Sequence, residues 1–134
     1  MKKIIWILVG IYIFLLNGCA PKNQSVYNIT DYGARADGKT VNSVAIQTAI
    51  KACYRKGGGT VLIPQGNFVT GTIRLLTNVN LHLEPGARLT GSTDTADYLF
   101  EDEMHGMIYA FQAKNISITG EGEIDGNGTS FFDD

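Results

Sequence analysis

Asn78-Val79-Asn80-Leu81-His82-Leu83-Glu84 is the stretch of sequence that decides the fold. Its apolar residues alternate with polar ones, which is the period of a half-buried β-strand, and Pro85-Gly86 ends the strand. The pattern returns 37 residues later, from Asn78 to Asn115, in Asn115-Ile116-Ser117-Ile118-Thr119-Gly120-Glu121. A unit of this length cannot enclose an apolar face alone, so the repeat predicts a solenoid in which successive strand units stack on one another.

The rest of the chain also favours short strands and tight turns. Thr60-Val61-Leu62-Ile63 is a further predicted strand, closed by Pro64, and the 16 glycines follow no three-residue period. The 37-residue offset is longer than a compact coil needs. The additional residues lie in the polar stretch from Ser92 to Gly106, so we expect this stretch to project from the stack as a loop. A sandwich or a barrel also shows short strands with turn signals and is the alternative fold.

An amphipathic helix precedes the strands. From Val44 to Cys53 apolar residues recur at the spacing of one helical face, on which Cys53 is expected to be a small buried hydrophobe. Gly57-Gly58-Gly59 is expected to end the helix. A parallel stack has unpaired backbone groups at its first coil, and this helix could cover them. Possible N-cap residues are Thr40, Asn42 and Ser43.

The first residues have the pattern of an export signal. Met1-Lys2-Lys3 precedes an apolar run, and Leu16-Asn17-Gly18-Cys19 resembles a bacterial lipoprotein processing box. As a helix the run would span about 20 Å, short of the ~30 Å hydrocarbon core of a membrane. We therefore expect a lipoprotein signal peptide over residues 1–18, a lipid on Cys19, a tether over 19–26 and a domain over 27–134, with ordinary secretory cleavage as the alternative. The protein would be exported to the cell envelope and anchored at the outer membrane or periplasmic face.

Composition and spacing exclude several kinds of site. The 134 residues carry a formal charge of −2, which argues against a nucleic-acid partner. Gly57-Gly58-Gly59 follows a helix and precedes a strand, the reverse of a phosphate-binding loop. His82 and His105 each lack a second ligand at metal spacing, and two cysteines cannot form a four-cysteine zinc site. We expect no metal and no other cofactor.

Carboxylates are the groups that sugar hydrolysis requires, as a general acid and a general base. Each of them here also has an ordinary role in a turn or on a solvated loop. The predicted loop as a whole is a better candidate for substrate contact, because long loops on rigid scaffolds often form the wall of a cleft. The candidates are Asp94, Asp97, Glu101-Asp102-Glu103 and Asp125.

Four stretches of the chain point together to a known family. They are Asp31-Tyr32-Gly33-Ala34 with Asp37-Gly38; the helix with Gly57-Gly58-Gly59-Thr60-Val61 and Pro64; Leu81-His82-Leu83-Glu84-Pro85-Gly86-Ala87 with Leu89-Thr90-Gly91-Ser92 and Asp97-Tyr98; and Asn115-Ile116-Ser117-Ile118-Thr119-Gly120 with Ile124-Asp125-Gly126-Asn127-Gly128. This set resembles the amino-terminal part of glycoside hydrolase family 28, the polygalacturonase-like enzymes. The first two stretches are shared with a broader group of parallel β-helix proteins, and the last two are more specific to the family.

The resemblance implies an all-β fold, a right-handed parallel β-helix of the pectin-lyase-like type with an amphipathic capping helix. It also implies inverting hydrolysis of pectin-type acidic polysaccharide, at α-linked galacturonic acid or rhamnogalacturonan units, without a metal. In the family, one aspartate protonates the leaving oxygen and others activate water. Asp133-Asp134 is a pair of aspartates, but it lies upstream of the place where the family has its own pair. We therefore assign no catalytic residue within this chain.

The opening coils are followed by no further repeats, so we expect the chain to be an amino-terminal fragment. Such a fragment would be inactive by itself and prone to aggregate, because its last coil is uncapped. Two alternatives to a hydrolase remain for the intact protein. One is a noncatalytic β-helix that binds polysaccharide or forms part of a surface, and the other is a pectate lyase that uses Ca²⁺ and a basic residue.

Overall fold

A computed structural model describes residues 24–128. The predicted signal peptide, the Cys19 lipid site and Asp133-Asp134 lie outside the described residues. The first strand begins at Val26, one residue before the expected start of the domain. Within residues 24–128, no helix is both long and apolar enough to cross a membrane.

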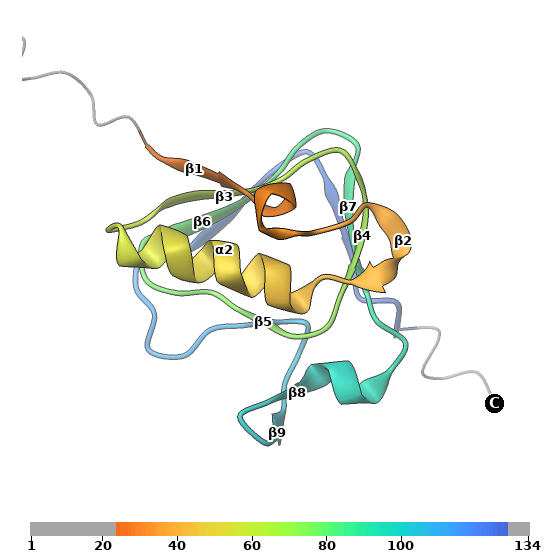
Figure 1. Cartoon of the computed structure of the whole chain (residues 1–134). Coiled ribbons are helices and arrows are strands. Elements are labelled where there is room, and N and C mark those ends of the chain that lie inside the picture. The colour runs from red at the N-terminus through yellow and green to blue at the C-terminus, as the bar shows by residue number, and fades with distance from the viewer. Residues whose placement is uncertain (1–23, 129–134) are drawn as a thin grey trace, which may run out of the picture.

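Short parallel strands wind into a coil and form three sheets (Figure 1). The first sheet contains β1 (Val26–Asn28), β3 (Gly59–Ile63), β6 (Val79–Leu83) and β11 (Ser117–Gly120). The second contains β2 (Asp37–Val41), β4 (Gly66–Thr70), β7 (Ala87–Gly91) and β12 (Glu123–Asp125), and the third contains β5 (Ile73–Arg74) and β10 (Ile108–Tyr109). The right-handed parallel β-helix is confirmed, and the sandwich and barrel alternatives are excluded.

The strand register confirms the repeat read from the sequence. Leu81 pairs with Val61 on one side and with Ile118 on the other, so the expected 37-residue offset is the register between β6 and β11. The side chains that alternate inward along these strands form the core. Val61, Leu81, Phe68 and Leu89 are fully buried, with Phe68 paired to Leu89 in the second sheet.

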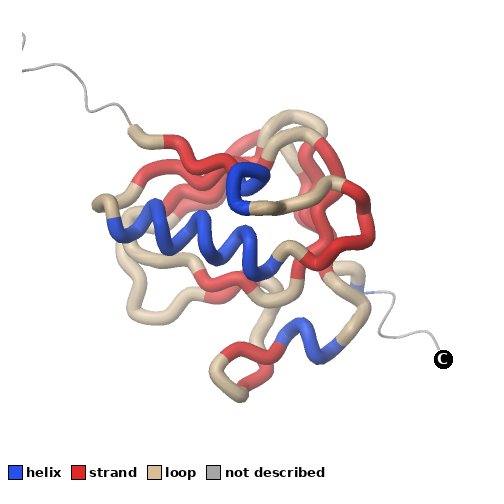
Figure 2. The backbone as a smooth tube through the Cα atoms, viewed as in Figure 1, coloured by secondary structure: helices blue, strands red, loops and turns tan. Residues whose placement is uncertain are grey.

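Helix α2 (Ser43–Arg55) covers the first coil, as expected (Figure 2). Its buried residues are Ile46, Ala49, Ile50 and Cys53. Cys53 is fully buried, as predicted, and burial raises the pKa of its thiol. The apolar face of the helix thus belongs to the same core as the strands.

The glycines after α2 end it as predicted. Gly57 has a φ of 95°, in the left-handed region that glycine occupies without a Cβ clash. Its N–H donates to the carbonyl of Tyr54 at 3.0 Å, and the N–H of Gly58 donates to that of Cys53 at 2.9 Å. These bonds satisfy carbonyls that the helix leaves unpaired at its end.

The expected N-caps behave differently. Asn42 occupies the N-cap position, but its side chain makes no capping hydrogen bond. Instead its Oδ1 accepts from the N–H of Arg35 at 2.8 Å, and its Nδ2 donates to the carbonyl of Val69 at 3.0 Å. The hydroxyl of Thr40 donates to Asp37, and that of Ser43 accepts from the N–H of Gly71 at 2.7 Å. Asn42 is thus confirmed as the N-cap residue. The expected capping hydrogen bond is wrong, because the side chains of Asn42 and Ser43 bond to backbone groups of the coil instead.

The side chain of Gln47, on α2, pairs with the backbone of β5. Oε1 of Gln47 accepts from the N–H of Arg74 at 2.7 Å, and its Nε2 donates to the carbonyl of Arg74 at 3.0 Å. The side-chain amide of Gln47 thus presents the same donor and acceptor to the edge of β5 as a neighbouring peptide group would. The cap satisfies backbone groups as well as covering apolar ones.

Candidate functional site

The stretch from Ser92 to Gly106 projects from the coil, as the sequence predicted (Figure 1). It contains a short 3₁₀ helix, η2 (Thr95–Tyr98), and a small antiparallel hairpin of β8 (Leu99–Phe100) and β9 (Glu103–Met104). We call residues 92–106 the insert. It is a folded element rather than an irregular loop.

Thr72, at the start of the third sheet, anchors the insert to the coil. This residue is 5% exposed, and its hydroxyl donates to the carbonyl of Gly106 at 3.0 Å. Its backbone N–H donates to the carbonyl of Asp97, also at 3.0 Å. At the beginning of the insert, the backbone N–H of Ser92 donates to the carbonyl of Thr70 at 2.8 Å. The insert is therefore held at both its beginning and its end.

A close backbone approach fixes the position of η2. A Cβ added to Gly71 would overlap the carbonyl of Asp97. Glycine is required here because the insert packs directly on the backbone of the coil.

Charged side chains form a ladder on the outer face of the second sheet. Arg88 on β7 is paired with Glu123 on β12 in the strand register, and Thr90 is paired with Asp125. The guanidinium of Arg88 donates to the Asp125 carboxylate at 2.7 Å and lies 3.6 Å from that of Glu123. We call these three residues the Arg88 ladder.

The ladder determines what Asp125 can do chemically. The backbone N–H of Asn127 donates to Asp125 at 2.8 Å, and this bond together with Arg88 lowers the pKa of the carboxyl group. A carboxylate held in its charged form is a poor general acid at neutral pH. Asp125 therefore has the turn role that its sequence context allowed, combined with an ion pair.

A small groove of about 200 Å³ runs beside the ladder, where the second sheet meets the beginning of the insert. Its polar side chains are hydroxyls, amides and one ammonium group, and Thr90 donates to Asn67 at 2.8 Å. These groups can bind sugar hydroxyls and one carboxylate. The polar side chains that line it include Lys39, Asn67, Thr90, Thr93 and Asn127.

The other predicted carboxylates serve local structure. Asp94 accepts from the N–H of Ala96 at 2.9 Å and caps η2, and Asp97 accepts from the hydroxyl of Ser92. Of the acidic trio, Glu101 lies 3.9 Å from Arg74 and Glu103 lies 3.9 Å from His105. The bonds of Asp94 and Asp97 are those of turn-forming residues.

The two histidines lie in different elements. His82 is on β6, and its Nδ1 is 2.8 Å from the hydroxyl of Thr119 on β11. His105 follows the β8–β9 hairpin, and its ring centroid lies 4.1 Å from that of Tyr109. Within residues 24–128, no three His, Cys, Asp or Glu side chains are grouped so that they could hold a metal ion.

Sequence reasoning missed the cationic residues of these surfaces. Arg88 and Asp125 are separated by the same 37 residues that relate the two strand units, so the repeat itself could have revealed the pair. Arg74 had no such signal, because its ring partner Tyr109 comes near it only after the insert has folded back.

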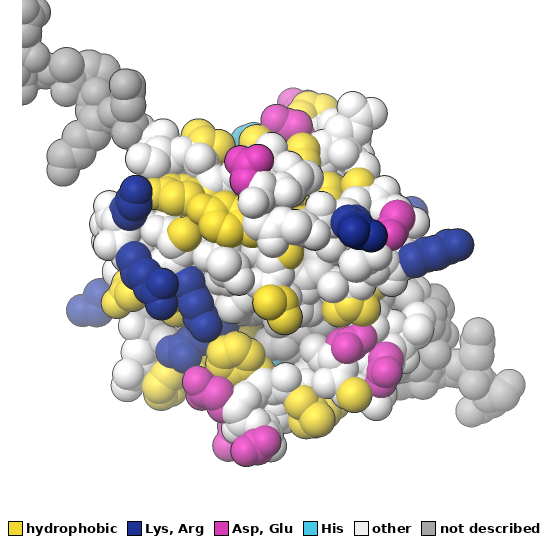
Figure 3. Space-filling view, viewed as in Figure 1, with side chains coloured by type: hydrophobic (Ala, Val, Ile, Leu, Met, Phe, Trp, Pro, Cys, Tyr) yellow, Lys and Arg dark blue, Asp and Glu magenta, His cyan; other side chains and the backbone are white. Residues whose placement is uncertain are grey.

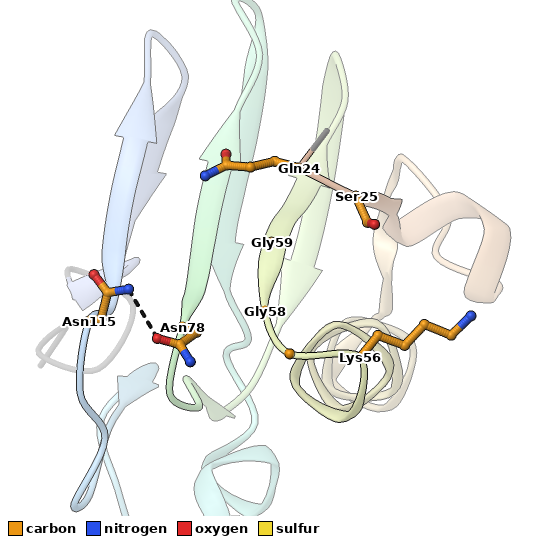
Figure 4. A pocket seen from close by; sticks show the side chains of 8 residues that line it. Gln24, Ser25, Lys56, Gly58, Gly59, Asn78 and Asn115 are labelled. Carbon is orange, nitrogen blue, oxygen red and sulfur yellow. Dashed lines mark hydrogen bonds between the residues drawn. The ribbon is translucent and has the colours of Figure 1, made fainter. Parts of the chain in front are cut away.

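A further depression lies where the chain turns into the first sheet (Figure 4). Asn78 and Asn115 both have positive φ, of 65° and 55°, and occupy equivalent corners of successive coils. Nδ2 of Asn115 donates to Oδ1 of Asn78 at 3.0 Å, and Lys56 points away from both. This hydrogen bond joins two structural turns, so we assign the depression no chemistry.

A family model described as rhamnogalacturonase A/epimerase, pectate lyase-like, matches residues 26–133. The chain belongs to this family. Membership in the rhamnogalacturonase A/epimerase-like family agrees with the parallel coil and the stacked turns described above. It also places the chain among proteins of the pectate lyase-like fold.

Individual relatives of this rhamnogalacturonase A/epimerase-like chain confirm the resemblance to glycoside hydrolase family 28. The exo-poly-α-D-galacturonosidase of Dickeya chrysanthemi is 38% identical over 120 residues, covering 77% of this chain and 20% of the relative. The solved family 28 exopolygalacturonase of Yersinia enterocolitica superposes with a TM-score of 0.70 at 37% identity, covering 78% of this chain and 21% of the other. The chain thus spans about a fifth of the length of these relatives.

A shorter match concerns another activity. Alginate lyase 7 of Azotobacter vinelandii is 52% identical over 42 residues, covering 31% of this chain and 5% of the relative. Part of this chain is therefore also similar to a protein named for a different reaction.

Proposed function

We propose that this chain forms the opening coils of an enzyme that hydrolyses pectin-type polysaccharide at α-linked galacturonic acid or rhamnogalacturonan units, with inversion. The observation that carries the proposal is the 38% identity with an exo-poly-α-D-galacturonosidase over 77% of the chain. The fold gives the same support, since a family 28 exopolygalacturonase superposes with a TM-score of 0.70.

The residues described here would position the substrate rather than cleave it. Inverting hydrolysis requires a protonated acid and a carboxylate base about 6.5 to 9.5 Å apart. Asp125 is kept charged by Arg88 and Asn127, and Asp97 is engaged by Ser92. We therefore assign the catalytic carboxylates to later coils, and to this chain the rigid scaffold with the groove at Lys39 and Thr90.

The test uses the protein encoded by the complete gene, incubated with polygalacturonate. Hydrolysis releases new reducing ends and gives no ultraviolet-absorbing unsaturated product. Proton NMR of the first product should show the anomer opposite to that of the substrate linkage. Retention of the anomeric configuration, or an unsaturated product, would contradict the proposal. The 134-residue chain alone is expected to release no sugar.

The second candidate is proton abstraction beside the sugar carboxylate, as in a lyase or an epimerase. The 52% identity with alginate lyase 7 over 42 residues favours it. A lyase forms a double bond that absorbs in the ultraviolet, and an epimerase incorporates solvent deuterium at C5. An unsaturated product, or deuterium at C5, obtained from the complete protein would establish this candidate.

We further propose that the protein is exported and anchored through Cys19. The support is the Leu16-Asn17-Gly18-Cys19 box after a lysine-led apolar run. Fatty-acid labelling in the source cell should mark the protein, and the Cys19→Ser variant should take up no label. Equal labelling of both would exclude lipid attachment at this residue.

A further inference from the structure

A groove of about 220 Å³ lies on the third sheet, away from the Arg88 ladder of the second. It has room for about seven water molecules at their liquid volume, which suits one sugar unit. The end of helix α2 forms one side and the chain after β10 forms the other. Its lining includes Tyr54, Arg74, Thr77, Phe111 and Gln112.

Arg74 supplies a guanidinium group with few partners. Within residues 24–128 its one ion pair is a 3.9 Å approach to Glu101, a side chain that is 74% exposed, and the cation lies 5.9 Å from the ring centroid of Tyr109. Among the described residues, its Nε is buried and finds no hydrogen-bond partner. A guanidinium has five N–H donors in a planar fork that matches a carboxylate, so this group can accept an anionic ligand.

Two exposed aromatic side chains line the same groove as Arg74. Tyr54 is 49% exposed and Phe111 is 54% exposed, although both are large side chains that would gain from burial. An aromatic ring next to a cation suits a ligand that has both an apolar C–H face and a negative charge. A pyranose ring bearing a carboxylate has both.

The surroundings carry positive charge. Figure 3 shows Lys and Arg side chains gathered over the carboxyl end of α2, the part of the helix that contains Lys51 and Arg55 and is followed by Lys56. Glu101 faces Arg74 from the insert and is the anion that a ligand would displace. Because Glu101 is well exposed and its contact is long, this displacement costs little.

We propose that this groove binds one uronic acid unit of an acidic polysaccharide, separately from the groove beside the Arg88 ladder. The sugar carboxylate pairs with Arg74, and the C–H face of the ring lies against Phe111 or Tyr54. The choice of polymer rests on the proposed function. The consequence is a second point of attachment, which would hold a long substrate on the coil while another part of it is processed.

The test measures binding of end-labelled trigalacturonate to the full chain by fluorescence anisotropy. Arg74→Gln should weaken binding about tenfold, the loss expected for one charge-assisted hydrogen-bonded pair. Phe111→Ala changes only an exposed ring and should weaken binding about fivefold. Labelled maltotriose, which has no carboxylate, should bind weakly and equally to all variants.

Matched controls are Arg35→Gln and Val44→Ala, at exposed positions outside the groove. Both should bind trigalacturonate as the unchanged chain does. Unchanged binding by Arg74→Gln and Phe111→Ala, or an equal loss in the controls, would overturn the inference. Thermal melting shows whether Arg74→Gln remains folded. If this variant unfolds, the binding of trigalacturonate by Phe111→Ala tests the inference instead.

The hydrolysis assay keeps the two proposals separate. If the complete protein cleaves polygalacturonate while Arg74→Gln binds normally, the groove proposal alone fails. If binding depends on Arg74 and the complete protein cleaves nothing, the groove stands and the proposed reaction fails.

Discussion

Asn42 and Gln47 place their side-chain amides against backbone groups of the coil. Asn42 is 2% exposed and joins the ends of β2 and β4, and Gln47 pairs with both backbone groups of Arg74. A primary amide offers both a donor and an acceptor, so it can replace a peptide group at the edge of a sheet. Helix α2 and its N-cap residue are therefore attached to the coil by specific hydrogen bonds as well as by apolar contacts.

Gln47→Leu should lower the free energy of unfolding by about 2 kcal/mol, because it leaves the N–H and C=O of Arg74 without partners. Leucine and glutamine have similar helix propensities, so the helix itself should be unaffected. Urea denaturation measures the loss. Lys51→Leu, on the same helix and exposed, is the control and should change stability by much less.

Asp37 should make stability depend on pH in the acid range. Hydrogen bonds from the Thr40 hydroxyl, then from the N–H groups of Thr40 and Lys39, lower the pKa of Asp37 from 3.8 to about 2. A lowered pKa stabilises the folded chain above the unfolded value, and this contribution disappears as the pH falls from about 4 to about 2. The urea midpoints of the chain and of Asp37→Ala should therefore converge over that range. A difference as large at pH 2 as at pH 5 would contradict this assignment.

The single-residue predictions from the sequence succeeded for apolar positions and for the turn roles of Asp94 and Asp125, and they missed the polar contacts between distant segments. Cys53 and the inward leucines follow from periodicity, because burial depends on which face a residue occupies. The partners of Asn42 and Arg74 depend on segments 27 and 35 residues away, and no local pattern encodes such contacts.

The insert is the element on which both grooves depend, since it begins beside one and its hairpin reaches Arg74 beside the other. Its position depends on the close contact between Gly71 and Asp97. Local sequence predicted its existence and its bounds, because the excess length between strand units is visible in the repeat. Its internal 3₁₀ helix and hairpin were not predicted, since they are only two to four residues long.

Gly71→Ala should displace the insert and lower stability by about 1 to 3 kcal/mol, because the added methyl group overlaps the Asp97 carbonyl. Hydrogen exchange should speed up at Asp97 and across residues 95–106 and remain slow in β3 and β6. Gly126→Ala is the control, because a Cβ there meets nothing within 4 Å. Unchanged exchange in the insert of Gly71→Ala would show that the contact does not hold it.

Over the whole described molecule, burial differs between the two ends of the coil. The first coil is covered by α2, whereas Ile118 and Ile124 are 46% and 41% exposed although they pair with the buried Leu81 and Leu89. The repeat and the helix were enough to predict this architecture, because each coil repeats the alternation of the one before. The strands β4, β5 and β7 escaped sequence analysis because glycine, asparagine and arginine interrupt their apolar residues.

Ile118→Thr should reduce the self-association of the 134-residue chain at high concentration. An exposed isoleucine beside an open strand edge gives a second copy both apolar area and unpaired backbone groups. Sedimentation velocity across a concentration series would measure the change. Val44→Thr removes a side chain that is 81% exposed, far from this edge, and should leave self-association unaltered.

The residues that cover the first coil, 42–55, precede in the sequence every strand from β3 onward. They leave the ribosome before those strands, so synthesis delivers the closed end of the coil first. Each later strand then finds a finished edge on one side, and the molecule can lengthen in only one direction. The order of synthesis therefore matches the order in which the coils are stacked.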